Sequence, residues 1–201
     1  HAGFGKEAQE NYDTNHLDGA LFLELNSDLS DIKEDAANGG RHPLPNPETF
    51  CKLLASLGIK ESNHIVIYDH KNGANSSARL WWMLKAINHK KVQVLNGGFQ
   101  EALKNDFPIN SKAVSKPMTT KYQLSKKWNL PQIDINEIER VSESKNHILI
   151  DVRSNERYKG ITEPIDLIAG HIPGAINIPF ADNLDENGLF KSPEVLREKY
   201  H

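Results

Sequence analysis

The sequence has very little cysteine, since Cys51 is the only one among 201 residues. One cysteine can form neither an intramolecular disulfide nor a cysteine-based metal cage. A single thiol fits a reducing compartment, so we expect a cytoplasmic protein. Because the first residue is His1 rather than methionine, a targeting segment upstream of it stays an open alternative.

The sequence also lacks an excess of charge and any long apolar run. Its 24 basic and 27 acidic residues are interspersed and give a net charge of -3, which disfavours binding to nucleic acid or to an anionic membrane. The longest purely apolar run, 80–84, is far shorter than the roughly 20 residues that a membrane-spanning helix needs. The nine histidines show no ligand spacing such as His-x-x-x-His. We therefore expect no nucleic-acid, membrane or metal partner, and no cofactor.

A repeat organises what the sequence does contain. The string GHIPGAINIP at 170–179 combines turn-forming glycines and a proline with an alternating apolar run, so it predicts a turn followed by a short strand. A weaker copy starts at His16, 155 residues before His171. In both copies a histidine, an aliphatic residue, one variable position, a glycine and an alanine precede an apolar run. The repeat predicts a tandem duplication.

Predicted strands alternate with predicted helices in both halves, which is typical of a parallel sheet flanked by helices. Asn46 and Pro47 predict the start of a helix that ends at Gly58. The apolar runs 65–68 and 148–152 predict strands that are buried on both faces. The loop 69–79 leads from a strand into a helix, and this order gathers backbone N–H groups in a geometry suited to an anion. The predicted fold class is α/β.

Changes in composition divide the chain into three parts. We predict a first domain over 1–107, a linker rich in proline, serine, threonine and lysine over 108–131, and a second domain over 132–201. Aligning the two copies on their histidines puts the opening strand of the first domain before residue 1. The same alignment puts the second domain's counterpart of the 69–79 loop after residue 201. Both domains are therefore expected to be incomplete, either because the chain is a fragment cut at both ends or because its ends lie outside this sequence.

Several motifs in a fixed order connect the chain to a known family. The second half contains DVRSNERYKG at 151–160, GHIPGAINIPF at 170–180 and FKSPEVL at 190–196. The first half contains HLDGALF, HPLPNPETF, VIYD, ARLWWML and LNGGF. Together these motifs resemble the tandem rhodanese-type sulfurtransferases, the family of thiosulfate and 3-mercaptopyruvate sulfurtransferases. The resemblance covers roughly residues 12 to 200 and implies two α/β domains with parallel sheets.

The resemblance also implies a reaction. Members of the family move sulfane sulfur from a small anionic donor, thiosulfate or 3-mercaptopyruvate, to cyanide or a thiol through a cysteine persulfide. The family's nucleophilic cysteine opens the second domain's loop, so we expect it after His201. The first domain is then non-catalytic, and the 201 residues alone are expected to be inactive. The alternative is a non-catalytic rhodanese-like module with a binding or regulatory role.

The resemblance assigns roles to three residues of the second half and marks a departure from the family pattern at two more. Arg157 matches the donor-binding arginine of the family, and a guanidinium suits an oxyanion or a carboxylate, although an ordinary surface arginine is the alternative. Asp151 and Arg153 match positions that brace the active-site loop. Glu163 and Asp166 lie where some relatives that use 3-mercaptopyruvate have an additional arginine. This departure favours thiosulfate as the donor.

Other reactive residue types are expected to be structural. Cys51 lies within a predicted helix beside apolar residues, so we predict a packing role rather than a nucleophile. His16 and His171 each precede a tight turn, which favours a hydrogen-bonded structural role. The loop 69–79 contains no cysteine and is expected to support the domain interface, with residual anion binding as the alternative.

Overall fold

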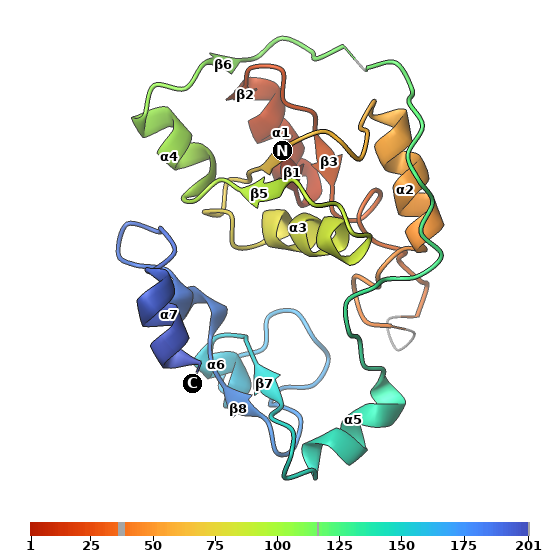
Figure 1. Cartoon of the computed structure of the whole chain (residues 1–201). Helices are drawn as coiled ribbons and strands as arrows, with labels where there is room; N and C mark the ends of the chain where they lie inside the picture. The colour runs from red at the N-terminus through yellow and green to blue at the C-terminus, as the bar shows by residue number, and fades with distance from the viewer. Residues whose placement is uncertain (36–38, 116, 201) are drawn as a thin grey trace. The chain divides into compact units, whose positions relative to one another are not determined.

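The computed structural model describes residues 1–35, 39–115 and 117–200 (Figure 1). The chain forms two compact units, His1–Leu130 and Pro131–His201. Among the residues described, no helix is both long enough and apolar enough to span a membrane.

The first unit alternates strands and helices along most of its length. Its strands are β1 (Ala2–Gly3), β2 (His16–Leu17), β3 (Leu23–Glu24), β4 (Ile65–Ile67), β5 (Val92–Val94) and β6 (Ile109–Asn110). Its helices are α1 (Gly5–Thr14), α2 (Pro47–Ser56), α3 (Ser76–Ala86) and α4 (Gly98–Lys104).

The strands of the first unit pair mainly in parallel. Strand β1 pairs with β3 and β4 pairs with β5 in parallel, whereas β2 and β6 pair antiparallel. The Ala2 N–H donates to the carbonyl of Tyr68, directly after β4, at 3.0 Å and so connects the two parallel pairs. The strand that we expected before residue 1 therefore ends inside the chain, as β1. The predicted position was wrong because it assumed the same strand-to-histidine distance in both halves. Twelve residues separate Gly3 from His16, whereas nineteen separate Asp151 from His171.

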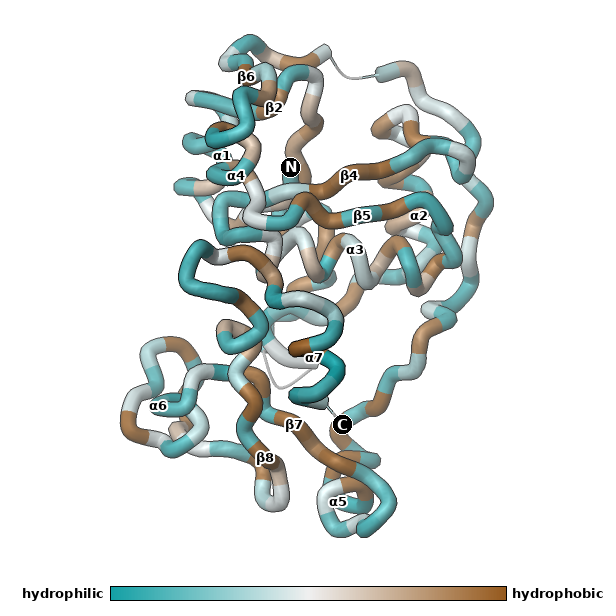
Figure 2. Tube along the Cα trace, turned by 60° about the vertical axis from the view of Figure 1, so that its left-hand side comes forward, coloured by the Kyte–Doolittle hydropathy of each residue, from teal (hydrophilic) through white to brown (hydrophobic). Residues whose placement is uncertain are grey.

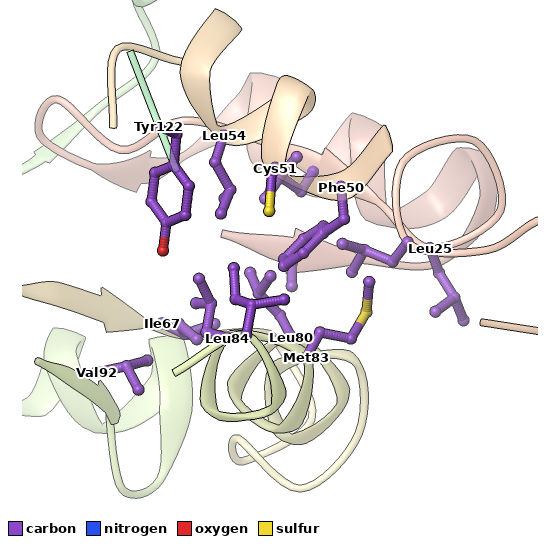
Figure 3. Close-up of a cluster of buried hydrophobic side chains, with 14 residues drawn as sticks. Leu25, Phe50, Cys51, Leu54, Ile67, Leu80, Met83, Leu84, Val92 and Tyr122 are labelled. Atoms are coloured by element: carbon purple, nitrogen blue, oxygen red, sulfur yellow. The ribbon is translucent and has the colours of Figure 1, made fainter. Parts of the chain in front are cut away.

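Helix α2 begins where the sequence predicts. The Asn46 side chain accepts a hydrogen bond from the Glu48 N–H at 2.8 Å, and Pro47 occupies the first helical turn. The helix places its apolar face against α3 and β4 in the core (Figure 3). The largest fully buried apolar side chains of this core are Phe50, Leu29, Leu54, Ile67, Met83 and Leu84.

Much of the segment 108–131, which we predicted as a linker, belongs to the first unit and packs along it. The Thr120 N–H donates to the carbonyl of Ala55 at 2.9 Å. The buried Tyr122 ring stacks on His89, and the Trp128 ring lies beside those of α2 and α3. Aromatic side chains in an otherwise polar stretch therefore hold most of the predicted linker against the core.

The second unit is smaller and has little buried apolar surface. It contains α5 (Ile135–Ser142), β7 (Ile150–Asp151), α6 (Asn155–Tyr158), β8 (Ile176–Asn177), the 3-10 helix η1 (Phe180–Asn183) and α7 (Pro193–Lys199). Strands β7 and β8 are parallel, in the same relation as β1 and β3. Figure 2 shows the apolar residues along β7 in brown.

Two predicted strands are less buried than we expected. In the first unit Val66 is 53% exposed, so β4 buries only one of its faces. In the second unit Ile148 is 74% exposed, and the strand covers only 150–151 of the predicted 148–152. The reason is that each strand pairs on one side in a two-stranded sheet within the described residues, and such a sheet cannot cover both faces of an apolar run.

Candidate anion-binding site

The candidate site of the second unit is built from the turn after β7 and the helix that follows. Asp151 ends β7, and its carboxylate accepts a hydrogen bond from the Arg153 N–H at 2.9 Å. Helix α6 then begins at Asn155, which places Arg157 in its last turn. The loop that leaves α6 brings Glu163 and Asp166 back to this arginine. Strand, turn and helix thus gather the charged residues that the family resemblance singled out.

Arg153 holds the turn together through its guanidinium. Its Nε donates to Oδ1 of Asp151 at 3.0 Å, and its Nη2 donates to Oδ2 at 2.6 Å. The same Nη2 donates to the carbonyl of Gly170 at 2.5 Å, and Nη1 lies 3.3 Å from Glu163. The hydrogen bonds between the Arg153 and Asp151 side chains lower the pKa of Asp151 and raise the pKa of Arg153. These contacts are consistent with the predicted role of Asp151 and Arg153 in bracing the active-site loop, and that role stays a prediction.

Arg157 is almost buried and is engaged by two carboxylates. Its side chain is 15% exposed. Its Nε and Nη2 donate to Oε2 and Oε1 of Glu163 at 3.1 and 2.8 Å, which is a bidentate pair. Nη2 also donates to Oδ2 of Asp166 at 2.8 Å. The arginine that we predicted to bind the donor is therefore already neutralised by the chain's own acids.

Glu163 is fixed from several sides. Besides Arg157, the backbone N–H groups of Ile165 and Asp166 donate to its Oε1 at 3.0 and 2.9 Å. The hydrogen bond from Arg157, followed by that from the Asp166 N–H, lowers the pKa of Glu163 to about 2. We expected an altered donor preference from Glu163 and Asp166, but sequence reasoning did not identify their pairing with Arg157. The alternation of basic and acidic residues over 153–166 is the only signal for it in the sequence.

A cavity of about 520 Å³ lies next to this charged cluster within the second unit. Asp151, Arg153, Asp166 and His171 supply its polar wall, and apolar residues of β7 and of the loop 168–172 supply the rest. Arg157 is not among the residues that line it. Within the described ranges no group of three or more histidine, cysteine or acidic side chains is arranged to hold a metal ion.

His171 packs against the same helix through two contacts. Its Nδ1 lies 2.7 Å from the carbonyl of Tyr158, which requires the proton on Nδ1, and its ring stacks on that of Tyr158 at 3.8 Å. The Tyr158 hydroxyl in turn donates to the carbonyl of Ala175 at 2.8 Å. These contacts fix the turn before β8, which agrees with the predicted structural role.

The first unit repeats this arrangement. His16 lies 2.8 Å from the carbonyl of Tyr12 and stacks on its ring at 4.2 Å, and the Tyr12 hydroxyl donates to the carbonyl of Ala20 at 2.5 Å. His16 is fully buried. Sequence analysis found the histidine repeat but not the tyrosines, because they lie four residues before His16 and thirteen before His171.

The loop 69–79 of the first unit is closed by its own carboxylate. Asp69 is buried and accepts hydrogen bonds from the backbone N–H groups of Lys71 and Gly73, both at 2.8 Å, and of Ser77 at 3.1 Å. Three of the N–H groups in the loop that we considered for residual anion binding are thus occupied. The sequence signal for this closure was an aspartate directly before a glycine-bearing loop.

Cys51 lies in the core and not in a loop. Its side chain is fully buried within α2, and this burial raises the pKa of the thiol. A nucleophilic thiol needs a depressed pKa and access to solvent. The position of Cys51 agrees with the predicted packing role.

The fold and the site define a class: two α/β units, each with a parallel strand pair fixed by a tyrosine and a histidine. The rhodanese-like domain model matches residues 7–105 and 134–200. The chain therefore belongs to the rhodanese-like domain family and contains two such domains.

Individual relatives agree with this assignment. The chain is 35% identical over 200 residues to the human 3-mercaptopyruvate sulfurtransferase and 36% identical over 202 residues to the bovine thiosulfate sulfurtransferase. It spans 98% and 97% of its own length in these matches but only 65% of each relative. Among solved structures, the 3-mercaptopyruvate sulfurtransferase from Leishmania major superposes with a TM-score of 0.83 at 25% identity, over 98% of this chain and 54% of that one.

Proposed function

We propose that the whole protein is a sulfurtransferase that moves sulfane sulfur from a small anionic donor to cyanide or a thiol. This proposal rests on membership of the rhodanese-like domain family together with Arg157, a nearly buried arginine on α6. Relatives named for both donors match the chain about equally well, over nearly its whole length. A cytoplasmic location stays a prediction that rests on the single cysteine.

In the proposed reaction Arg157 binds the oxyanion end of the donor. A cysteine thiolate located after His201 attacks the outer sulfur of thiosulfate, the S–S bond breaks, and its electron pair leaves with sulfite. The acceptor then attacks the outer sulfur of the persulfide, which gives thiocyanate from cyanide and returns the thiolate. Cys51 cannot supply this thiolate because it is buried in the core. The 201 residues alone are therefore expected to form no persulfide.

We further propose thiosulfate as the preferred donor. Between Arg157 and Gly170 the chain has no second arginine, and Glu163 and Asp166 add negative charge there. A carboxylate donor such as 3-mercaptopyruvate would have to compete with these acids using a single cation.

The test compares Arg157→Ala with the wild type in the full-length protein, using thiosulfate and cyanide. A charge-assisted hydrogen bond contributes roughly 1.5–3 kcal/mol, so kcat/KM for thiosulfate should fall about 10- to 150-fold. Arg140→Ala is the matched control, because Arg140 lies on α5, is exposed and pairs with Glu137. Unchanged kinetics for Arg157→Ala would contradict the proposed role.

A non-catalytic binding module is the second candidate, and the first unit favours it. Its loop 69–79 has the strand-to-helix position of the family's active-site loop, yet it contains no cysteine and is closed by Asp69. If the full-length protein produces no thiocyanate from thiosulfate or 3-mercaptopyruvate, this second candidate replaces the first.

A further inference from the structure

The Glu163 carboxylate divides its two oxygens between different partners. Oε1 accepts from the backbone N–H groups of Ile165 and Asp166 at 3.0 and 2.9 Å and from Nη2 of Arg157 at 2.8 Å. Oε2 accepts from Nε of Arg157 at 3.1 Å and from Nη1 of Arg153 at 3.3 Å. One oxygen thus holds the loop that follows α6, and the other lies between two guanidinium groups.

We propose that Glu163 is the positioning residue of Arg157 and fixes its guanidinium in the orientation that binds the sulfur donor. This inference rests on the proposed function, in which Arg157 binds the donor. Glu163 acts through Arg157 and does not touch the donor itself.

Two properties of Arg157 call for a fixed anionic partner. Its side chain is 15% exposed, so the guanidinium is largely removed from water and needs a carboxylate beside it. A second cation, Arg153, approaches the same oxygen of Glu163, and two neighbouring guanidinium groups repel each other unless an anion lies between them. Glu163 meets both needs, because its bidentate contact fixes the plane of the Arg157 guanidinium as well as balancing its charge.

Glu163 can fix Arg157 because it is itself fixed. Its side chain is 5% exposed, and Oε1 is tied to the backbone of its own loop. Through Oε2 it contacts Arg153, which is bonded at two nitrogens to Asp151 at the end of β7. A continuous set of contacts therefore leads from the strand to Arg157, and a long, flexible side chain takes its orientation from the strand.

Charge and position predict opposite effects for the isosteric variant Glu163→Gln. Glutamine keeps an oxygen that can accept from the two N–H groups of the loop, whereas its NH2 group cannot accept from the two arginines. If Glu163 acted only by reducing positive charge, its replacement would strengthen donor binding and lower the thiosulfate KM. Because Glu163 positions Arg157, we expect KM to rise about two- to tenfold, the effect of one lost hydrogen bond.

The experiment measures thiosulfate kinetics of Glu163→Gln in the full-length protein at saturating cyanide, alone and combined with Arg157→Ala. Alone, the variant should raise KM and leave kcat unchanged, because Arg157 binds the anionic end of the donor and not the sulfur that is transferred. Combined with Arg157→Ala, it should raise KM no further, since a positioning residue has no effect once its target is removed. Glu156→Gln is the control: it removes the same charge from an exposed position on α6 and should not raise KM.

The outcomes separate this inference from the function on which it rests. If Arg157→Ala leaves the thiosulfate KM and kcat/KM unchanged, the donor role of Arg157 is wrong and the inference falls with it. If Arg157→Ala weakens donor use but Glu163→Gln leaves KM unchanged or lowers it, only the inference is overturned. An equal rise in KM when Glu163→Gln is added to Arg157→Ala would overturn it as well, because Glu163 would then act through the stability of the loop and not through Arg157.

Discussion

Cys51 provides a sharp test of the core, because it is the only thiol in the 201 residues. Its neighbours in α2, Phe50 and Leu54, are each about 1% exposed. To expose Cys51, α2 must leave the core and bring these two side chains into water. Burial of each is worth about 1.5–3 kcal/mol, so the opening costs at least about 3–6 kcal/mol.

This free energy predicts slow thiol chemistry. Since 1.4 kcal/mol is a factor of ten, the native chain should react with a disulfide reagent such as DTNB about 10²- to 10⁴-fold more slowly than the unfolded chain. The raised pKa of the thiol slows the native reaction further, because only the thiolate attacks.

The assay follows release of the reagent's chromophore from the 201-residue chain at neutral pH, with and without denaturant. One equivalent should appear promptly in denaturant and slowly without it. Far-UV circular dichroism on the same sample shows that α2 and the other helices are formed. Stoichiometric reaction of the folded chain at the rate of the unfolded chain would refute the burial argument and reopen Cys51 as a nucleophile.

Two further predictions concern stability. Asn46→Ala removes the side-chain oxygen that accepts from the Glu48 N–H, so it should lower the free energy of unfolding by about 1 kcal/mol in urea titrations. Asn46→Asp should retain the cap and the stability. An equal loss of stability in both variants would contradict the capping role of Asn46. The folded-state pKa of Glu163, about 2, lies below its ordinary value of 4.5, so its contribution is present above pH 4.5 and lost as pH falls towards 2. Hydrogen exchange should show the Ile165 and Asp166 amides losing protection in this window in the wild type but not in Glu163→Gln, and a pH-independent wild type would refute the assignment.

Local sequence signals predicted local structure well. The Asn46–Pro47 pair marks the start of α2 because capping involves only neighbouring backbone groups, and the structure confirms it. The parallel relation of strands in both halves follows from alternating elements and is also present. The prediction that these strands are buried on both faces was wrong at Val66 and Ile148, because an apolar run does not show how many neighbouring strands and helices cover it.

The contacts that the sequence did not predict depend on where a loop folds back onto the rest of its unit. Glu163 pairs with Arg157 because the backbone N–H groups of Ile165 and Asp166 turn its carboxylate towards α6. The packing of 108–130 on the first unit depends in the same way on where Tyr122 and Trp128 land. The alternation of basic and acidic residues over 153–166 is the one sequence signal for the first of these contacts, and no periodic pattern indicates the second.

Two places in the described part of the chain that could attract an anion, the loop 69–79 and Arg157, are engaged by the chain's own carboxylates. Asp69 is 2% exposed and satisfies three backbone N–H groups, so an external anion would have to bury a charge in its place while Asp69 lost all three bonds. Arg157 of the second unit has a side chain that is 15% exposed, and its guanidinium pairs with Glu163 and Asp166. Closure by Asp69 therefore disfavours an external anion in the loop 69–79, and the proposed donor site is the arginine of the second unit.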